Sequence, residues 1–333
     1  MNTPTRVAAF AGGLAAAFAA ALGVGTLTGP IGATSTAEPA GHDAGHTDTG
    51  TTEQAAAQDL PGGLMVSQDG YTLAVAQRQL PAAAEAPIQF QILGPNGQPV
   101  TRYTTAHGKD LHLIVVRRDL ANFKHVHPQL DAAGTWSVPL DLSDAGAYRL
   151  FADFTPADRD DNLTLGADLS VAGAYSPEPL PATSRTAEVD GYTVTLDGAL
   201  VPGQEAELTL TVSQDGRPVT DLQPYLEAYG HLVALRDRDL AYLHVHPAGT
   251  PGDGQTKPGP GITFYATVPS SGDYRLFLDF RHGDKVRTAA FTVTAGSAER
   301  SPEPVPSASP EQPAEPSASA SEPEDGHSDG HGG

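Results

Sequence analysis

The chain has no cysteine, and only 18% of its 333 residues are charged. The lack of cysteine excludes disulfide bridges, thiolate zinc sites, iron–sulfur clusters and blue-copper centres, because each needs cysteine sulfur. Basic side chains are scarce as well: 19 Lys and Arg stand against 40 Asp and Glu, a formal net charge of −21. Because nucleic-acid binding needs clustered basic side chains, no nucleic-acid partner is expected.

Helical periodicity is also missing from the middle of the chain, where no segment keeps a 3.6-residue repeat over three turns. Apolar and polar residues instead alternate over residues 88–92 and 208–212, the period of a half-buried strand. Asn96-Gly97 and Asp215-Gly216 follow these two segments, and both dipeptides favour hairpin turns. The sequence therefore predicts an all-β fold.

The two ends of the chain do not have the composition of a packed domain. Residues 1–37 combine Arg6 with an apolar run over 7–24 and small residues after it, which predicts a signal peptide or an N-terminal membrane anchor. Residues 38–66 are predicted to be a disordered linker, and residues 297–333 a disordered acidic Ser/Pro/His tail. The protein is then secreted or held at the extracellular face of the membrane, touching the bilayer only through an uncleaved N-terminal segment.

The middle of the chain is an internal duplication. Several motifs recur in the same order at an offset of 119 to 126 residues: Asp-Gly-Tyr at 69 and 190, Arg-Asp-Leu-Ala at 118 and 238, His-Val-His-Pro at 125 and 244, and Tyr-Arg-Leu-Phe at 148 and 274. They define two domains, 67–173 and 188–296, joined by a Pro-rich linker over 174–187. About seven short strands in each repeat predict a β-sandwich.

One segment in each repeat narrows the fold further. Residues 144–150, Asp-Ala-Gly-Ala-Tyr-Arg-Leu, resemble the strand-F signature of immunoglobulin-type sandwiches, with Leu150 in place of the disulfide cysteine. Residues 270–276 keep the Gly and the Tyr but not the Asp. The resemblance implies two tandem immunoglobulin-like (Greek-key) β-sandwich domains. It also implies that the hydroxyls of Tyr148 and Tyr274 bond to nearby backbone and hold a corner.

Histidine is the residue type that could carry chemistry, because the two repeats share a His-x12-His-x-His spacing. Alternate residues of a strand face the same side, so each His-x-His pair presents two adjacent imidazoles. A hairpin whose opposed residue numbers sum to 239 places His112 opposite His127. The corresponding sum of 477 places His231 opposite His246. One metal site in each repeat is therefore predicted, with the ligands His112, His125, His127, His231, His244 and His246.

The donor set favours copper, with zinc as the second choice. Cu(II) heads the affinity order at nitrogen ligands, whereas Cu(I) prefers sulfur and the chain has only Met1 and Met65. Asp153 and Asp279, in the recurring Leu-Phe-x-Asp-Phe, are candidate fourth ligands. Alternatively, each of these two carboxylates pairs with the recurring Arg or is a surface charge on a strand.

The His-Val-His-Pro motif, on a sandwich behind an export signal, resembles exported tandem β-sandwich proteins of the actinobacterial type. The resemblance extends broadly to periplasmic or secreted domains that handle heavy metals such as copper. It implies an exported metal-handling protein. Copper–zinc superoxide dismutase also has a His-Val-His strand, but it needs more histidines and a disulfide that this chain lacks.

Two functions remain open, and neither is enzymatic. In the first, each repeat binds Cu(II) or Zn(II) and the protein buffers or delivers metal at the cell surface. In the second, the sandwiches are a structural or protein-interaction module with a cell-surface protein partner and no metal role. No nucleophile–base arrangement, phosphate-binding glycine loop or spaced carboxylate pair is present to suggest catalysis.

Overall fold

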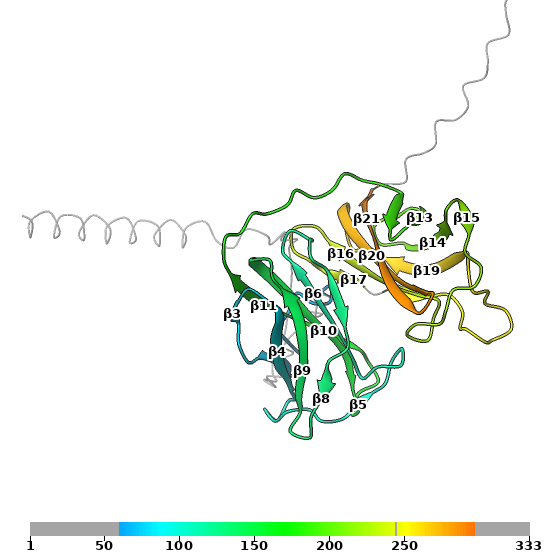
Figure 1. The fold of residues 1–333 in the computed structure, drawn as a ribbon. Coiled ribbons are helices and arrows are strands. Elements are labelled where there is room, and N and C mark those ends of the chain that lie inside the picture. The colour runs from blue at the N-terminus through cyan, green and yellow to red at the C-terminus, as the bar shows by residue number, and fades with distance from the viewer. Residues whose placement is uncertain (1–59, 244, 297–333) are drawn as a thin grey trace, which may run out of the picture. The chain divides into compact units, whose positions relative to one another are not determined.

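The computed structural model describes residues 60–243 and 245–296. The predicted N-terminal signal or anchor, most of the linker after it, the C-terminal tail and His244 lie outside the described residues. Within these residues every regular element is a strand, and no helix is long and apolar enough to cross a membrane. The all-β prediction is confirmed (Figure 1).

The first repeat is a sandwich of two sheets. One sheet has the order β1-β2-β4-β9-β8, with bounds Ser67–Gln68, Tyr71–Val75, Ala83–Leu93, Thr135–Leu142 and Gln129–Leu130. The other has the order β3-β11-β10-β6-β7, with bounds Gln79–Pro81, Leu163–Ala172, Gly146–Pro156, Leu111–Arg117 and Lys124–Val126, and β5 (Tyr103–Thr104) pairs with β10. Strand β3 runs parallel to β11, and the other strand pairs are antiparallel.

The second repeat has the same Greek-key connectivity. One sheet has the order β12-β13-β14-β19-β18, with bounds Thr186–Val189, Tyr192–Asp197, Glu205–Gln214, Gly261–Thr267 and Val245–Pro247, and β15 (Arg217–Pro218) pairs with β14. The other has the order β17-β16-β20-β21, with bounds Tyr242–Leu243, Gly230–Arg236, Gly272–His282 and Lys285–Ala295. Both repeats are immunoglobulin-like sandwiches, as predicted.

Alternation along the strands builds the core of each sandwich. Ile88, Phe90 and Ile92 of β4 are buried while the residues between them are more exposed, and β14 repeats the pattern. The single tryptophan, Trp136, is buried in the first core and donates its indole N–H to Tyr103 at 3.1 Å. The alternation in the sequence predicted these strands correctly, because each strand faces solvent on one side and the core on the other.

Each repeat also has the predicted tyrosine corner. The Tyr148 hydroxyl donates to the Asp144 carbonyl at 2.8 Å, and the Tyr274 hydroxyl donates to the Ser270 carbonyl at 2.8 Å. Both rings are buried. These bonds fix the turn that leads into β10 and β20, the central strands on which the recurring Arg and Asp lie.

A third apolar cluster joins the two repeats. It is made by the outer faces of β6 and β10 and of β16 and β20, with the turns beside them: Ile114, Val116, Leu120 and Phe151 from the first repeat, and Val233, Leu235, Leu240, Tyr242 and Phe277 from the second. Phe123 packs against it, stacked on Phe277 with ring centroids 3.9 Å apart. The sheets that carry the histidines are therefore buried on both faces, which explains the continuous apolar run at 113–116.

The tyrosine corner can be tested with Tyr148→Phe. Loss of the bond to the Asp144 carbonyl is expected to lower the free energy of unfolding by about 1 kcal/mol. Urea denaturation followed by tryptophan fluorescence measures it. Tyr175→Phe is the control, because this ring is exposed. Equal stability of the two variants would contradict a structural role for the corner.

Candidate metal centre

Strands β6 and β7 bring the first histidine trio together. They pair with Leu113 opposite Val126 and Ile114 opposite His125, so the paired residue numbers sum to 239. The predicted hairpin register is thus confirmed for the first repeat. His112 and His127 follow at the next opposed positions, and His125 lies on the same side of the sheet, the side that faces the second repeat.

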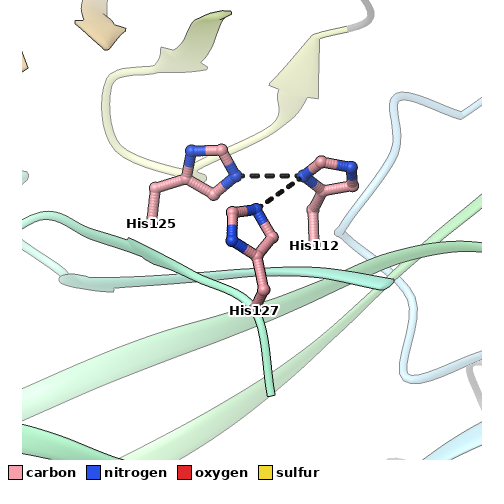
Figure 2. Close-up of side chains that lie close together, drawn as sticks. All are labelled: His112, His125 and His127. Atoms are coloured by element: carbon pink, nitrogen blue, oxygen red, sulfur yellow. Dashed lines mark hydrogen bonds between the residues drawn. The ribbon is translucent and has the colours of Figure 1, made fainter. Parts of the chain in front are cut away.

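The three imidazoles converge through their ring nitrogens (Figure 2). His112 Nδ1 lies 3.1 Å from His125 Nε2 and 3.3 Å from His127 Nε2. One nitrogen from each ring lies within 4.8 Å of the other two. His112 is buried, the side chain of His125 is 1% exposed, and His127 is half-buried. The arrangement is the convergence that the His-x12-His-x-His spacing predicts.

Neighbouring oxygens determine which nitrogens carry protons. His112 Nε2 lies 3.1 Å from the carbonyl oxygen of Ala106, which can only accept, so this nitrogen is the N–H donor. His125 Nδ1 donates in the same way to Asp279 Oδ2 at 2.7 Å. In the neutral rings, His112 Nδ1 and His125 Nε2 are therefore bare lone pairs facing each other across 3.1 Å. Two acceptors repel each other unless a cation lies between them.

Protonation of His112 or His127 is a costly way to supply that cation. Burial lowers the pKa of His112 to about 4 and the pKa of His127 to about 3, and a proton on either ring would be repelled by any other proton in the cluster. Both rings are therefore neutral at physiological pH. Neutral imidazole is also the form that binds a divalent metal.

A fourth histidine reaches this cluster from the second repeat. His231 stacks on His112 with centroids 5.3 Å apart and an interplanar angle of 4°, and on His125 at 4.8 Å. Burial lowers its pKa well below the usual value. Because it is absent from the group of converging nitrogens, its contribution to the centre is its ring face.

His107 is a member of the cluster that the sequence analysis missed, because it does not recur. Its ring lies 6.1 Å from that of His112 and 5.7 Å from that of His231. It forms a tight turn with Gly108, both at positive φ, closed by two bonds between Ala106 and Lys109. That turn aims the Ala106 carbonyl at His112. The sequence signal was the His-Gly dipeptide just ahead of the strand.

The two candidate fourth ligands lie behind the trio. Asp279 accepts from His125 Nδ1 with one oxygen and from the Thr288 hydroxyl with the other, at 2.6 Å. Asp153 accepts from the Thr164 hydroxyl at 3.0 Å, and burial raises the pKa of its carboxyl. Asp279 thus orients a histidine of the other repeat, while Asp153 bonds within its own sheet.

The second repeat does not reproduce the first hairpin in full. Strands β16 and β17 pair with Ala234 opposite Leu243, the predicted register with its sum of 477. However, β17 ends at Leu243, and β18 pairs with β19 of the other sheet, where His246 lies opposite Tyr265 and is exposed. The predicted pairing of His231 with His246 is wrong, because the chain changes sheets before reaching His246.

The ligand assignment of His231, His244 and His246 stays a prediction, since His244 lies outside the described residues. In the first repeat the change of sheet comes later: β7 continues to Val126, and β8 joins β9 only from Gln129. That difference keeps His127 beside His112.

Comparison with known proteins identifies the family. The family described as "Domain of unknown function (DUF8832)" matches residues 66–170 and again residues 187–297. The chain belongs to this family and carries its domain twice. A comparison with curated proteins gives no match.

Solved structures give only weak likenesses. The adhesin InvE of Yersinia pseudotuberculosis has 18% identity and a TM-score of 0.23, over 69% of this chain and 60% of its own. The Escherichia coli adhesin FdeC has 15% identity and a TM-score of 0.24, over 69% of this chain and 65% of its own. The chain thus spans about three fifths of their length. The immunoglobulin-like assignment rests on the strand order and the tyrosine corners.

The protonation pattern can be tested by ¹⁵N NMR of metal-free protein. We expect His112 to carry its proton on Nε2 and His125 on Nδ1, because the Ala106 carbonyl and Asp279 accept from those atoms. In Asp279→Leu the Nδ1–H form of His125 should lose its dominance while His112 is unchanged. The opposite tautomers in the unaltered protein would contradict the geometry.

Proposed function

We propose that the protein is an exported metal-binding protein that holds one divalent ion at His112, His125 and His127 and buffers or delivers it at the cell surface. The observation that carries the proposal is the convergence of three imidazole nitrogens, with His112 Nδ1 lying 3.1 Å from His125 Nε2 and 3.3 Å from His127 Nε2. Export is supported by the basic start and apolar run of residues 1–37.

The two distances from His112 Nδ1 suit a metal shared with each of the other two rings, whose own nitrogens lie within 4.8 Å of each other. With metal–nitrogen bonds of about 2.0–2.1 Å, two ligands lie about 3.3 Å apart at a tetrahedral angle and about 2.9 Å apart at a right angle. The observed 3.1 and 3.3 Å fall in this interval. Cu(II), which leads the affinity order at nitrogen ligands, is the first choice, and Zn(II) is the second.

Asp279 orients one of the three proposed ligands, His125, without being a ligand itself. A carboxylate that accepts from the far nitrogen of a ligating histidine fixes its tautomer and makes the near nitrogen more basic. Here Asp279 belongs to the second repeat and His125 to the first, with 2.7 Å between Oδ2 and Nδ1. On this proposal, both repeats are needed for tight binding although all three ligands come from one.

A second candidate function is a protein-interaction module with no metal role. The observation that favours it is the edge of β21, where the Thr288 carbonyl and the Ala290 amide have no backbone partner among the described residues. The two functions occupy different parts of the molecule. A separate experiment therefore tests each of them.

Metal binding can be measured by titrating Cu(II) and Zn(II) into the full chain with the tail histidines His42, His46, His327 and His331 replaced by Ala. About one tight equivalent is expected, and His125→Ala should remove it. His282→Ala is the control, because that ring bonds to Tyr192 and Asp221 instead. Unchanged stoichiometry in His125→Ala would refute the site, and a second tight equivalent lost in His246→Ala would restore a site in the second repeat.

The support from Asp279 is tested with Asp279→Asn, which keeps the shape but removes the charge. Metal affinity measured by competition with a chelator is expected to fall about 10–100-fold. Asp153→Asn is the matched control, because its carboxylate occupies the equivalent register position and bonds to Thr164. Equal losses in the two variants would mean that the contact with His125 has no special role.

A further inference from the structure

A short segment ahead of the first sandwich lies along the edge of β11; we name residues 60–66 the strap. The Gly63 amide donates to the Thr164 carbonyl and the Gly166 amide donates to the Met65 carbonyl, each at 2.8 Å. On its other side the strap meets the second repeat, where the Tyr242 amide donates to the Gly62 carbonyl at 2.9 Å. The strap thus fills the groove between the edge of β11 and β17.

The Arg149 side chain anchors the strap. Its guanidinium donates to the Gly63 carbonyl at 2.6 and 3.0 Å and to the Leu64 carbonyl at 3.0 Å. A side chain on Gly63 would collide with the Phe151 ring. The groove therefore recognises an extended backbone through one edge strand, one arginine and one aromatic floor.

The second repeat has an equivalent of each residue that holds the strap. Strand register makes Arg149 equivalent to Arg275 and Phe151 to Phe277, since both pairs lie in the recurring Tyr-Arg-Leu-Phe. Their partners on the edge strands follow: Thr164 corresponds to Thr288 and Gly166 to Ala290. The hairpin registers make Tyr242 equivalent to Phe123.

These equivalents line a pocket of about 350 Å³ beside the inter-repeat linker, whose Leu180 packs against the same apolar cluster as Phe123 and Ala290. Its walls include Arg275, Phe277, Phe123, Thr288 and Ala290. The inter-repeat linker forms one rim, where Glu178 is tied to Arg117 by an ion pair of 2.8 Å and Pro179 and Pro181 follow.

Arg275 is the polar group in this pocket that has spare donors. Its Nη1 donates to the Thr292 hydroxyl at 2.9 Å, and its buried Nε has no hydrogen-bond partner. No carboxylate pairs with it among the described residues, whereas Arg149 pairs with Asp168. Burial lowers the pKa of its guanidinium, which nonetheless stays protonated.

The edge of β21 supplies the other half of a peptide site. At the equivalent positions of β11, the Thr164 carbonyl and the Gly166 amide point away from β10, toward the strap. The matching register turns the Thr288 carbonyl and the Ala290 amide away from β20. Neither has a backbone partner within residues 60–243 and 245–296; the linker reaches this edge only further along, where the Ser184 amide donates to Thr292.

We propose that the edge of β21 and its pocket bind an extended segment of a partner polypeptide by β-strand addition. The segment pairs with the Thr288 carbonyl and the Ala290 amide, places a main-chain carbonyl on the Arg275 guanidinium and lays an apolar side chain in the pocket beside Phe123. The occupant is inferred from the strap, an extended, apolar, glycine-containing segment that fills the equivalent groove of the same fold.

One difference between the grooves defines the path of the ligand. A side chain on Gly166 would overlap the Gly63 carbonyl, and the second groove has the Ala290 methyl at that place. The ligand must therefore lie slightly further out than the strap does. Replacing Ala290 by Gly should let it settle closer and bind more tightly.

The test uses the full chain and a fluorescent peptide of residues 60–67, Leu-Pro-Gly-Gly-Leu-Met-Val-Ser, followed by fluorescence polarisation. Saturable binding is expected, weakened at least tenfold by Arg275→Met and strengthened by Ala290→Gly. Arg217→Met is the control, because Arg217 is exposed on β15 of the other sheet. Equal binding to the Arg275→Met and Arg217→Met proteins would overturn the proposal.

A second measurement leaves the protein unaltered and guards against misfolded variants. The same peptide with its backbone amides N-methylated cannot add to a strand, so its binding should be lost, whereas side-chain contacts alone would leave it. No saturable binding of the unmodified peptide would overturn the proposal. So would a dimer in sedimentation that Ala290→Pro dissociates, because the occupant of the edge would then be a second copy.

Discussion

The packing of the two repeats against each other is the contact on which the other features depend. An isolated sandwich of this kind would expose Ile114, Val116 and Phe151 on the outer face of one sheet, and its partner would expose Val233 and Phe277. Their union converts both faces into core. The same packing brings His112 of β6, His125 of β7, Asp279 of β20 and the strap into one region.

The geometry of the candidate metal centre depends on this contact. The first repeat alone supplies three imidazoles in the right register, but the tautomer of His125 depends on a carboxylate of the second repeat. His231 then closes the centre by covering the faces of two rings. Burial keeps His112 and His127 neutral, and neutral imidazole is the form that binds a divalent cation.

Local sequence patterns made the strands, the tyrosine corners and the first histidine hairpin predictable. Alternation along β4 and β14, the tyrosine corners and the hairpin register around His112 depend on neighbours a few positions or one turn away. The pairing of His125 with Asp279 spans 154 residues and requires the docking of the repeats, which no periodicity encodes. The exposure of His246 was missed for another reason: strand patterns do not reveal where a chain changes sheets.

The internal duplication explains why the two repeats carry equivalent residues, while the route of the chain into each repeat gives those residues different partners. Each repeat carries the same arginine and phenylalanine on its central strand, and the docking of the two faces creates two related grooves. The chain enters the first repeat through one groove, and the strap satisfies Arg149 there. The linker enters the second repeat along another route, pinned by Arg117, and leaves the Nε of Arg275 without an acceptor. The asymmetry thus arises from how the chain enters each repeat, and it leaves the Thr288 carbonyl and the Ala290 amide without a backbone partner among the described residues.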